Sequence, residues 1–154
     1  MVRLSDLAPE SAQHLLDKDC SEFETAPFVA GPPVRERRVA IVTTAGLHRR
    51  TDKNFALSDL SYRVIPGDVG LDDLVMTQAS VNFDRSGFQQ DVNVVLPLDR
   101  LREMDQAGEI GSVANFHYAF NGAGQLAPAF EPTAREVGRM LKEDGVNAAI
   151  LVPV

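Results

Sequence analysis

Two short apolar runs constrain the fold of this 154-residue chain more than any other feature. Residues 38–44 are RVAIVTT and residues 148–154 are AAILVPV, and neither run alternates with polar residues. Uninterrupted, β-branched runs of this kind are typical of strands covered on both faces, as in parallel sheets. We therefore expect two buried strands that are neighbours in one sheet. That arrangement brings the segment after Thr44 next to the end of the chain.

Further strand and helix patterns lie between these two runs. Shorter apolar runs predict strands at residues 62–65, 74–77 and 112–118. Apolar residues at helical spacing, with proline before and glycine after, predict helices at residues 97–104 and 132–144, and a short helix is expected at 11–18. The alternation predicts an α/β fold, a mostly parallel sheet flanked by helices with right-handed crossovers.

The first 37 residues differ from the rest. Pro27, Pro32 and Pro33 disfavour helix in the residues before them, so residues 23–33 are expected to form an extended, proline-containing arm. We therefore divide the chain into an amino-terminal helix and arm at 1–37 and an α/β domain at 38–154. The length allows about one domain of this kind.

Charge and composition limit the classes of binding partner that the chain can have. The chain has 15 basic and 22 acidic residues, a formal net charge of −7, so the basic excess that nucleic-acid binding requires is absent. No stretch approaches the roughly 20 apolar residues that cross a bilayer, and the amino terminus lacks the apolar core of a secretory signal. With Cys20 as the single cysteine, a cytoplasmic protein with no membrane or nucleic-acid partner is expected.

Chemistry-bearing residues follow the first buried run. In open α/β sheets ligands bind beyond the carboxyl ends of the strands. The segment after that run supplies Thr44, Gly46, His48, Arg49 and Arg50. Backbone donors near the glycine and a fork-shaped guanidinium suit a carboxylate or a phosphate, although no phosphate-loop or dinucleotide fingerprint is present. The alternative is that both arginines are solvated loop charges and that His48 caps a helix.

A second group of candidates is weaker. Asp84 and Arg85 lie in a polar, glycine-containing connection, and His117 lies in an apolar, aromatic segment. Asp84 can instead bond its own downstream amides, and a histidine such as His117 is more often a satisfied core residue than a ligand. Neither the histidine spacing nor the single cysteine fits a metal site, so no metal is expected.

Four motifs, in this order, carry a family resemblance. They are VAIVTTAGLHRR (39–50), YRVIPGD (62–68), VNFDRSGFQQDVNVVLPLDRL (81–101) and GSVANFHY (111–118). Together they resemble the selenoprotein B subunits of the glycine, sarcosine, betaine and D-proline reductase family. The resemblance extends over most of residues 3–154.

The resemblance implies a selenocysteine directly after the strand that matches residues 148–154. Selenocysteine is encoded by UGA, ordinarily a stop codon, so we expect that the chain ends where the nucleophile belongs and that it is inactive as given. Apolar surface around the last strand would then lack its cover, and the chain would self-associate as a homo-oligomer.

The resemblance also implies a reaction, the reductive cleavage of a C–N bond in an amino acid or a betaine-like substrate. A dithiol is the electron donor, and a pyruvoyl group is expected on a partner subunit. In this hypothesis His48 and His117 are catalytic, with His48 moving a proton. The other candidates bind substrate: Thr44, Gly46, Arg49, Arg50, Asp84 and Arg85. The alternatives are a non-catalytic binding or scaffold subunit with the same fold, and a small anion-binding module that uses residues 46–50.

Overall fold

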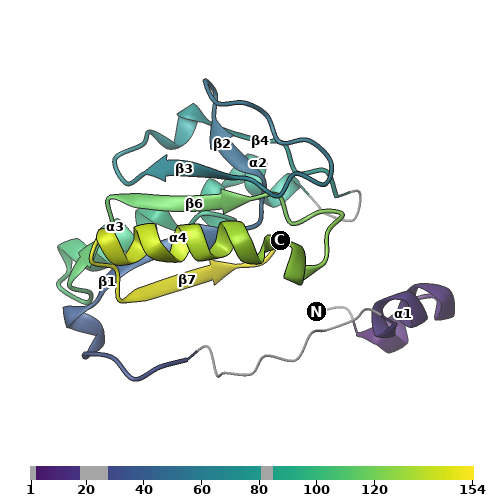
Figure 1. The fold of residues 1–154 in the computed structure, drawn as a ribbon, viewed down its shortest axis with the longest axis horizontal. Coiled ribbons are helices and arrows are strands. Elements are labelled where there is room, and N and C mark those ends of the chain that lie inside the picture. The colour runs from purple at the N-terminus through teal and green to yellow at the C-terminus, as the bar shows by residue number, and fades with distance from the viewer. Residues whose placement is uncertain (1–2, 18–27, 81–84) are drawn as a thin grey trace.

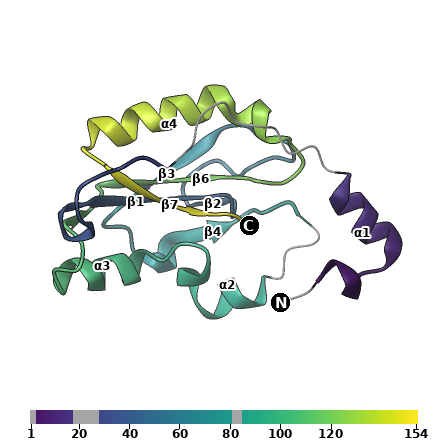
Figure 2. The same ribbon diagram turned by 90° about the horizontal axis from the view of Figure 1, so that it is seen from below.

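The computed structural model describes residues 3–17, 28–80 and 85–154. It confirms the predicted fold class, because a curled, mostly parallel sheet is covered by helices (Figures 1 and 2). The strands are β1 (Arg38–Thr43), β2 (Leu47–Arg49), β3 (Tyr62–Pro66), β4 (Leu74–Met76), β5 (Ser112–Val113), β6 (Phe116–Phe120) and β7 (Ala148–Val152). The helices are α1 (Pro9–Leu16), α2 (Ser86–Gln90), α3 (Leu98–Gln106) and α4 (Glu131–Glu143).

Strand β1 is the centre of the sheet. Strand β7 pairs with it in parallel over five residues, from Val39↔Ala148 to Thr43↔Val152. Strands β5 and β6 also run parallel to β1, and they pair with its start and its end. Because a strand has two edges and β7 occupies one of them, β5 and β6 follow each other along the other edge. The two apolar runs are therefore neighbours, as predicted.

The strand predicted at residues 112–118 is interrupted. It divides into β5 and β6, and two extra residues between them loosen the pairing with β1. The interruption packs against Gly67, whose amide donates to the Asn115 carbonyl at 2.7 Å. A Cβ at Gly67 would lie 2.5 Å from the Ala114 carbonyl oxygen, so only glycine allows this approach. Such a bulge bends a strand without breaking its apolar pattern, and the sequence therefore reads as one strand.

A two-stranded ribbon stands apart from the main sheet. Strand β4 forms at residues predicted as a strand, but it pairs with β2 in an antiparallel ribbon, whereas β3 joins the main sheet antiparallel to β6. The chain leaves β1 for this ribbon at Gly46, where φ is +66°. A Cβ there would lie 2.9 Å from the backbone nitrogen of Gln78, so glycine is required on two counts.

Each face of the sheet carries its own apolar core. Figure 2 shows α4 on one face and α2 and α3 on the other. Alternate residues of β1 pack into the two cores, because side chains of a strand point alternately to opposite faces of the sheet. Ile41 packs on the side of Leu98 and Leu101 of α3, and Val42 on the side of Val137 of α4. The helices thus fix β1 from above and below.

The prediction that residues 148–154 form a buried strand is wrong. Leu151 is 71% exposed and Ile150 is 38% exposed. Among the described residues, strand β7 pairs only along the edge it shares with β1, and its three middle residues, 149–151, are exposed. Burial on both faces requires a further element beside the strand, which an apolar pattern alone does not guarantee.

The amino-terminal region is described only in part. Helix α1 begins two residues earlier than predicted. Residues 18–27, which include Cys20 and part of the predicted arm, lie outside the described residues. The structure therefore does not establish the arm. Among the described residues, no helix has the length and apolar character needed to span a bilayer.

Candidate functional site

The carboxyl ends of β1 and β7 meet at Thr44 and Val154. The Thr44 hydroxyl accepts a hydrogen bond from the Val154 amide at 2.8 Å and donates to the Val154 carbonyl at 3.2 Å. Two residues before Val154, the Val152 carbonyl accepts from the Thr44 amide at 3.1 Å. The hydroxyl therefore continues the ladder between the two strands past its last backbone pair. It fixes the course of the backbone at the end of β7.

Gly122 closes one side of this junction. Its amide donates to the Thr44 carbonyl at 3.0 Å. A Cβ at Gly122 would lie 2.8 Å from Cβ of Thr44 and 3.3 Å from the Val154 carbonyl oxygen. A side chain at this position would displace one of the two strand ends, so glycine permits their close approach.

Gln78 and Arg85 lie on another side of the same junction. The Gln78 side chain, only 4% exposed, donates from Nε2 to the Thr44 carbonyl at 2.9 Å. The exposed Arg85 donates from Nη2 to the Gln78 backbone carbonyl at 2.5 Å. We refer to Thr44, Gln78, Arg85, Gly122 and Val154 as the strand-end site. Sequence analysis missed Gln78, although it follows a predicted strand directly and the rule for strand ends applied to it.

The two arginines predicted to bind the substrate carboxylate have protein partners. Arg49 ends β2 and bonds the Asp52 carboxylate through Nη2 at 2.9 Å and Nε at 3.2 Å. Arg50 donates from Nη2 to the Asp72 carbonyl at 3.3 Å. Arg49 belongs to the ribbon that leaves the main sheet and Arg50 follows it directly, and neither has a described bond to the strand-end site. Their role in binding a substrate stays a prediction.

His48 is 1% exposed and lies within β2. Its Nδ1 is 2.8 Å from the Arg49 carbonyl oxygen, and its ring meets Phe55 edge-on. An Nδ1 proton donated to that carbonyl leaves Nε2 as the acceptor, and this buried atom has no partner among the described residues. The alternative that His48 caps a helix is wrong, because the residue belongs to a strand. Its predicted part in proton transfer is untested.

His117 lies where the bulge separates β6 from β1. It is fully buried, and its Nδ1 accepts a hydrogen bond from the Ile41 amide at 2.9 Å, in place of a backbone partner. The ring proton of the neutral form is thus on Nε2, which has no partner among the described residues. Burial lowers the pKa of His117 to about 4, and the positive charge of Arg102 adds to this effect. This geometry gives His117 a structural contact and keeps its ring neutral.

We expect acid to destabilise the fold through His117. The unfolded chain takes up this proton near the ordinary pKa of 6.5, and the folded chain only near pH 4. Between these values the unfolded state binds more protons, so the free energy of unfolding decreases as the pH falls, by about 3 kcal/mol in full. Denaturant unfolding at several pH values measures this slope. Equal slopes for the wild type and His117→Gln would contradict the prediction.

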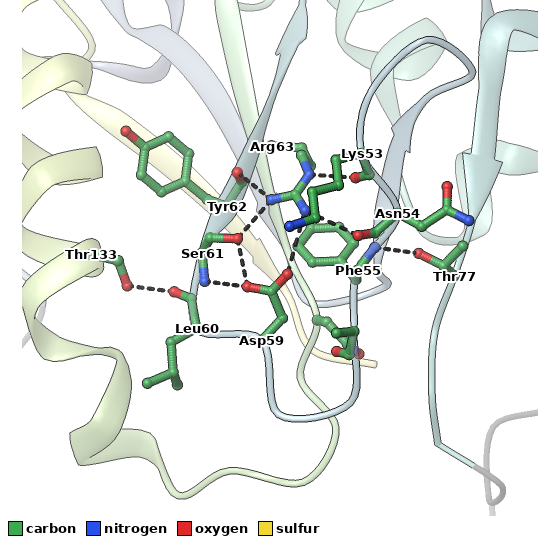
Figure 3. Close-up of polar contacts among 12 residues, drawn as sticks. Lys53, Asn54, Phe55, Asp59, Leu60, Ser61, Tyr62, Arg63, Thr77 and Thr133 are labelled. Atoms are coloured by element: carbon green, nitrogen blue, oxygen red, sulfur yellow. Dashed lines mark hydrogen bonds and ion pairs between the residues drawn. The ribbon is translucent and has the colours of Figure 1, made fainter.

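Arg63 holds the loop of residues 53–61, which leads into β3 (Figure 3). Its guanidinium donates to the carbonyls of Lys53, Asn54 and Tyr62 and to the side chains of Ser61 and Asp59. It also lies 4.2 Å above the centre of the Phe55 ring.

The loop that Arg63 holds is tied to the neighbouring elements as well. The Phe55 amide donates to the Thr77 hydroxyl at 3.1 Å, and the Asn121 side chain donates to the Ala56 carbonyl at 3.2 Å. The loop is thereby joined to the residues that precede Gln78 and Gly122. The remaining predicted residue, Asp84, lies outside the described residues.

The comparisons with known proteins agree on one family. The family model described as glycine/sarcosine/betaine reductase selenoprotein B matches residues 21–154. The D-proline reductase subunit gamma of Acetoanaerobium sticklandii is 37% identical over 132 residues, 82% of this chain and 54% of that subunit. The sarcosine reductase complex component B subunit beta of Peptoclostridium acidaminophilum is 32% identical over 120 residues, 74% of this chain and 27% of that subunit. No solved structure matches.

Fold and site together define an α/β protein whose candidate site lies at the carboxyl ends of neighbouring parallel strands. The family model covers most of the chain, and so this chain belongs to the glycine/sarcosine/betaine reductase selenoprotein B family. The chain spans about half the length of the D-proline reductase subunit and about a quarter of the sarcosine reductase subunit. The relatives are named as subunits of reductases, and those for sarcosine, betaine and glycine are named as components of a reductase complex.

Proposed function

We propose that this chain forms the amino-terminal α/β part of a subunit in an amino-acid or betaine reductase complex, and that selenocysteine follows Val154 in that subunit. One observation carries the proposal. The Thr44 hydroxyl bonds both backbone groups of Val154, which holds the next residue at the carboxyl end of the sheet. Ligands of open α/β sheets bind at that end.

The reaction is the reductive cleavage of a C–N bond next to a carboxylate. The nitrogen leaves as an amine, and the carbon gains a hydrogen. A dithiol supplies two electrons and two protons and becomes a disulfide. A selenolate supplies the nucleophile, since a selenol ionises more readily than a thiol. The pyruvoyl group expected in such a complex belongs to a partner subunit, and no residue of this chain is assigned to hold it.

The residues of the strand-end site suit a nucleophile placed after Val154. Thr44 fixes the backbone that leads to it, and Gly122 leaves no side chain between the two strand ends. Arg85 is exposed, and its Nη2 donates to the carbonyls of Gln78 and Ser80. Its guanidinium can therefore also bind a substrate carboxylate, a geometry for which arginine is well suited.

The test compares a substrate carboxylate with its neutral amide. The protein is the extended subunit, a polypeptide that continues past Val154 with selenocysteine, assayed with its partner subunits and a dithiol. Arg85→Ala is expected to raise KM for the carboxylate about 10- to 100-fold, because a charge-assisted hydrogen bond is lost, and to leave KM for the amide unchanged.

Three control variants locate the effect. Arg135→Ala removes an exposed guanidinium that is paired with Glu131 on α4, and it should leave both KM values unchanged. Arg49→Ala and Arg50→Ala test the arginines of the ribbon. If Arg49→Ala or Arg50→Ala raises KM for the carboxylate only, and Arg85→Ala does not, the carboxylate binds at Arg49 or Arg50 and not at Arg85. If the extended subunit consumes no substrate with any partner or amine, the scaffold alternative replaces the proposal.

A further inference from the structure

Gln78 is a buried amide whose side chain joins two separate backbone segments. Its Nε2 donates to the Thr44 carbonyl at 2.9 Å, and its Oε1 accepts from the Ser80 amide at 3.2 Å. Both ends of the amide thus have backbone partners, and the side chain is 4% exposed. A buried amide bonded at both ends in this way fixes the groups that it bonds, because breaking either bond leaves one end of the buried amide without its partner.

The two segments are the end of β1 and residues 78–80. The backbone carbonyls of Gln78 and Ser80 both accept from Nη2 of Arg85, at 2.5 Å and 3.4 Å. On the other side, the Thr44 hydroxyl bonds Val154. Hydrogen bonds therefore run without a break from the guanidinium of Arg85, through Gln78 and Thr44, to the end of β7.

We infer that Gln78 is a positioning residue that sets the guanidinium of Arg85 relative to the residue after Val154. The inference rests on the proposed function, since it needs Arg85 to bind the substrate carboxylate. The bond from Nε2 to the Thr44 carbonyl holds residues 78–80 against β1. The carbonyls of these residues in turn hold Nη2 of Arg85. Gln78 touches neither substrate nor nucleophile, so it acts on binding through Arg85.

The geometry around Gly46 supports this role. A Cβ at Gly46 would lie 2.9 Å from the Gln78 nitrogen and 3.1 Å from its Cα, so the Gln78 backbone packs directly against the turn after β1. The Thr77 amide also donates to the Gly46 carbonyl at 3.0 Å. Packing at the turn and the two side-chain bonds therefore act together on the backbone of residues 78–80. Removing the amide should release the carbonyls of Gln78 and Ser80 from their positions and leave the turn in place.

A double-mutant cycle tests the inference in the extended subunit with its partner subunits. Gln78→Met keeps the length of the side chain and removes both hydrogen bonds. We expect it to raise KM for the carboxylate substrate about tenfold with kcat nearly unchanged, because the guanidinium is displaced while the nucleophile is not. In the Arg85→Ala background the same substitution should change KM less than about twofold, since its effect passes through Arg85.

Two further variants separate positioning from stability. Thr133→Val removes a partly buried hydroxyl bond to the Leu60 carbonyl, away from the strand-end site. It should lower Tm, as Gln78→Met does, and leave KM unchanged. Gln78→Asn keeps the amide on a shorter side chain and replaces the methionine variant if that variant does not fold. Calorimetric titration of the substrate without dithiol gives the affinity independently of turnover.

The outcomes distinguish this inference from the proposed function. If the wild-type complex consumes no substrate, the proposed function is overturned. If Arg85→Ala raises KM and neither Gln78 variant does, the positioning role alone is overturned. Additive effects of the two substitutions would also overturn it, because Gln78 would then act by a separate route. A tenfold effect that disappears without Arg85 supports it.

Discussion

Replacing Arg63 with alanine is expected to lower the free energy of unfolding by about 3 kcal/mol and Tm by roughly 10 °C. The side chain of Arg63 is only 12% exposed, and its guanidinium bonds five groups (Figure 3). Three of these groups are backbone carbonyls of the loop and of β3, at 2.8 Å to 3.3 Å. Alanine would leave them without this donor and would remove the cation from the face of Phe55.

The cost also includes the carboxylate of Asp59. Partial burial raises the pKa of Asp59, but hydrogen bonds from Ser61 and the charge of Arg63 outweigh this effect, so the net pKa lies below its ordinary value. Without Arg63 this carboxylate loses its nearby cation. Calorimetry of the wild type and Arg63→Ala measures the difference.

Two variants serve as controls for Arg63. Arg135→Ala removes an exposed ion pair and should change stability by less than about 0.5 kcal/mol. Arg63→Lys keeps the charge but not the planar fork, and should recover only part of the loss. Equal Tm values for Arg63→Ala and Arg135→Ala would show that the loop does not depend on Arg63.

The second large effect concerns the nucleophile. Ending the chain at Val154, or placing serine after it in the extended subunit, should lower turnover by about a thousandfold or more, because catalytic groups that act as a unit fail together. Cysteine at that position should restore part of the rate, since less of a thiol than of a selenol is ionised at neutral pH. Substrate affinity should survive in the serine variant, because Arg85 and Thr44 remain.

The central sheet could be predicted because its strands are continuous apolar runs. The observed bounds of strand β1 and helix α4 agree with the predicted bounds to within about one residue at each end. The signals for both are local: a continuous apolar run for β1, and a proline at the start with a glycine after the end for α4. The pairing of β1 with β7 followed from the same runs. Three of the features that were missed or predicted wrongly have a clear physical cause.

Those errors involve features that sequence periodicity does not encode. The bulge between β5 and β6 depends on Gly67, which is far away in the sequence. Strand β2 is three residues long, and it exists because Gly46 turns the chain toward β4. The residues of β7 are apolar, but their exposure depends on which elements pack against the strand, and the apolar pattern does not show this.

The sequence indicated where the candidate site lies better than it indicated which residues form it. The rule of strand ends led to Thr44, which bonds Val154, and the polar connection led to Arg85. It did not lead to Gln78, whose importance comes from two backbone groups that only the fold brings together. His48 and His117 are both buried. Burial is common for a histidine in an apolar segment, but the sequence position alone does not determine it.

Dithiol-dependent substrate consumption tests the central claim most directly, namely that the reacting group follows Val154 at the carboxyl end of β7. The polypeptide of residues 1–154 and the extended subunit are assayed side by side, each with the same partner subunits and the same dithiol. The account predicts that the extended subunit consumes the amine substrate and that the polypeptide of residues 1–154 leaves it unchanged. Consumption at comparable rates by both would place the catalytic group within residues 1–154 and contradict the account.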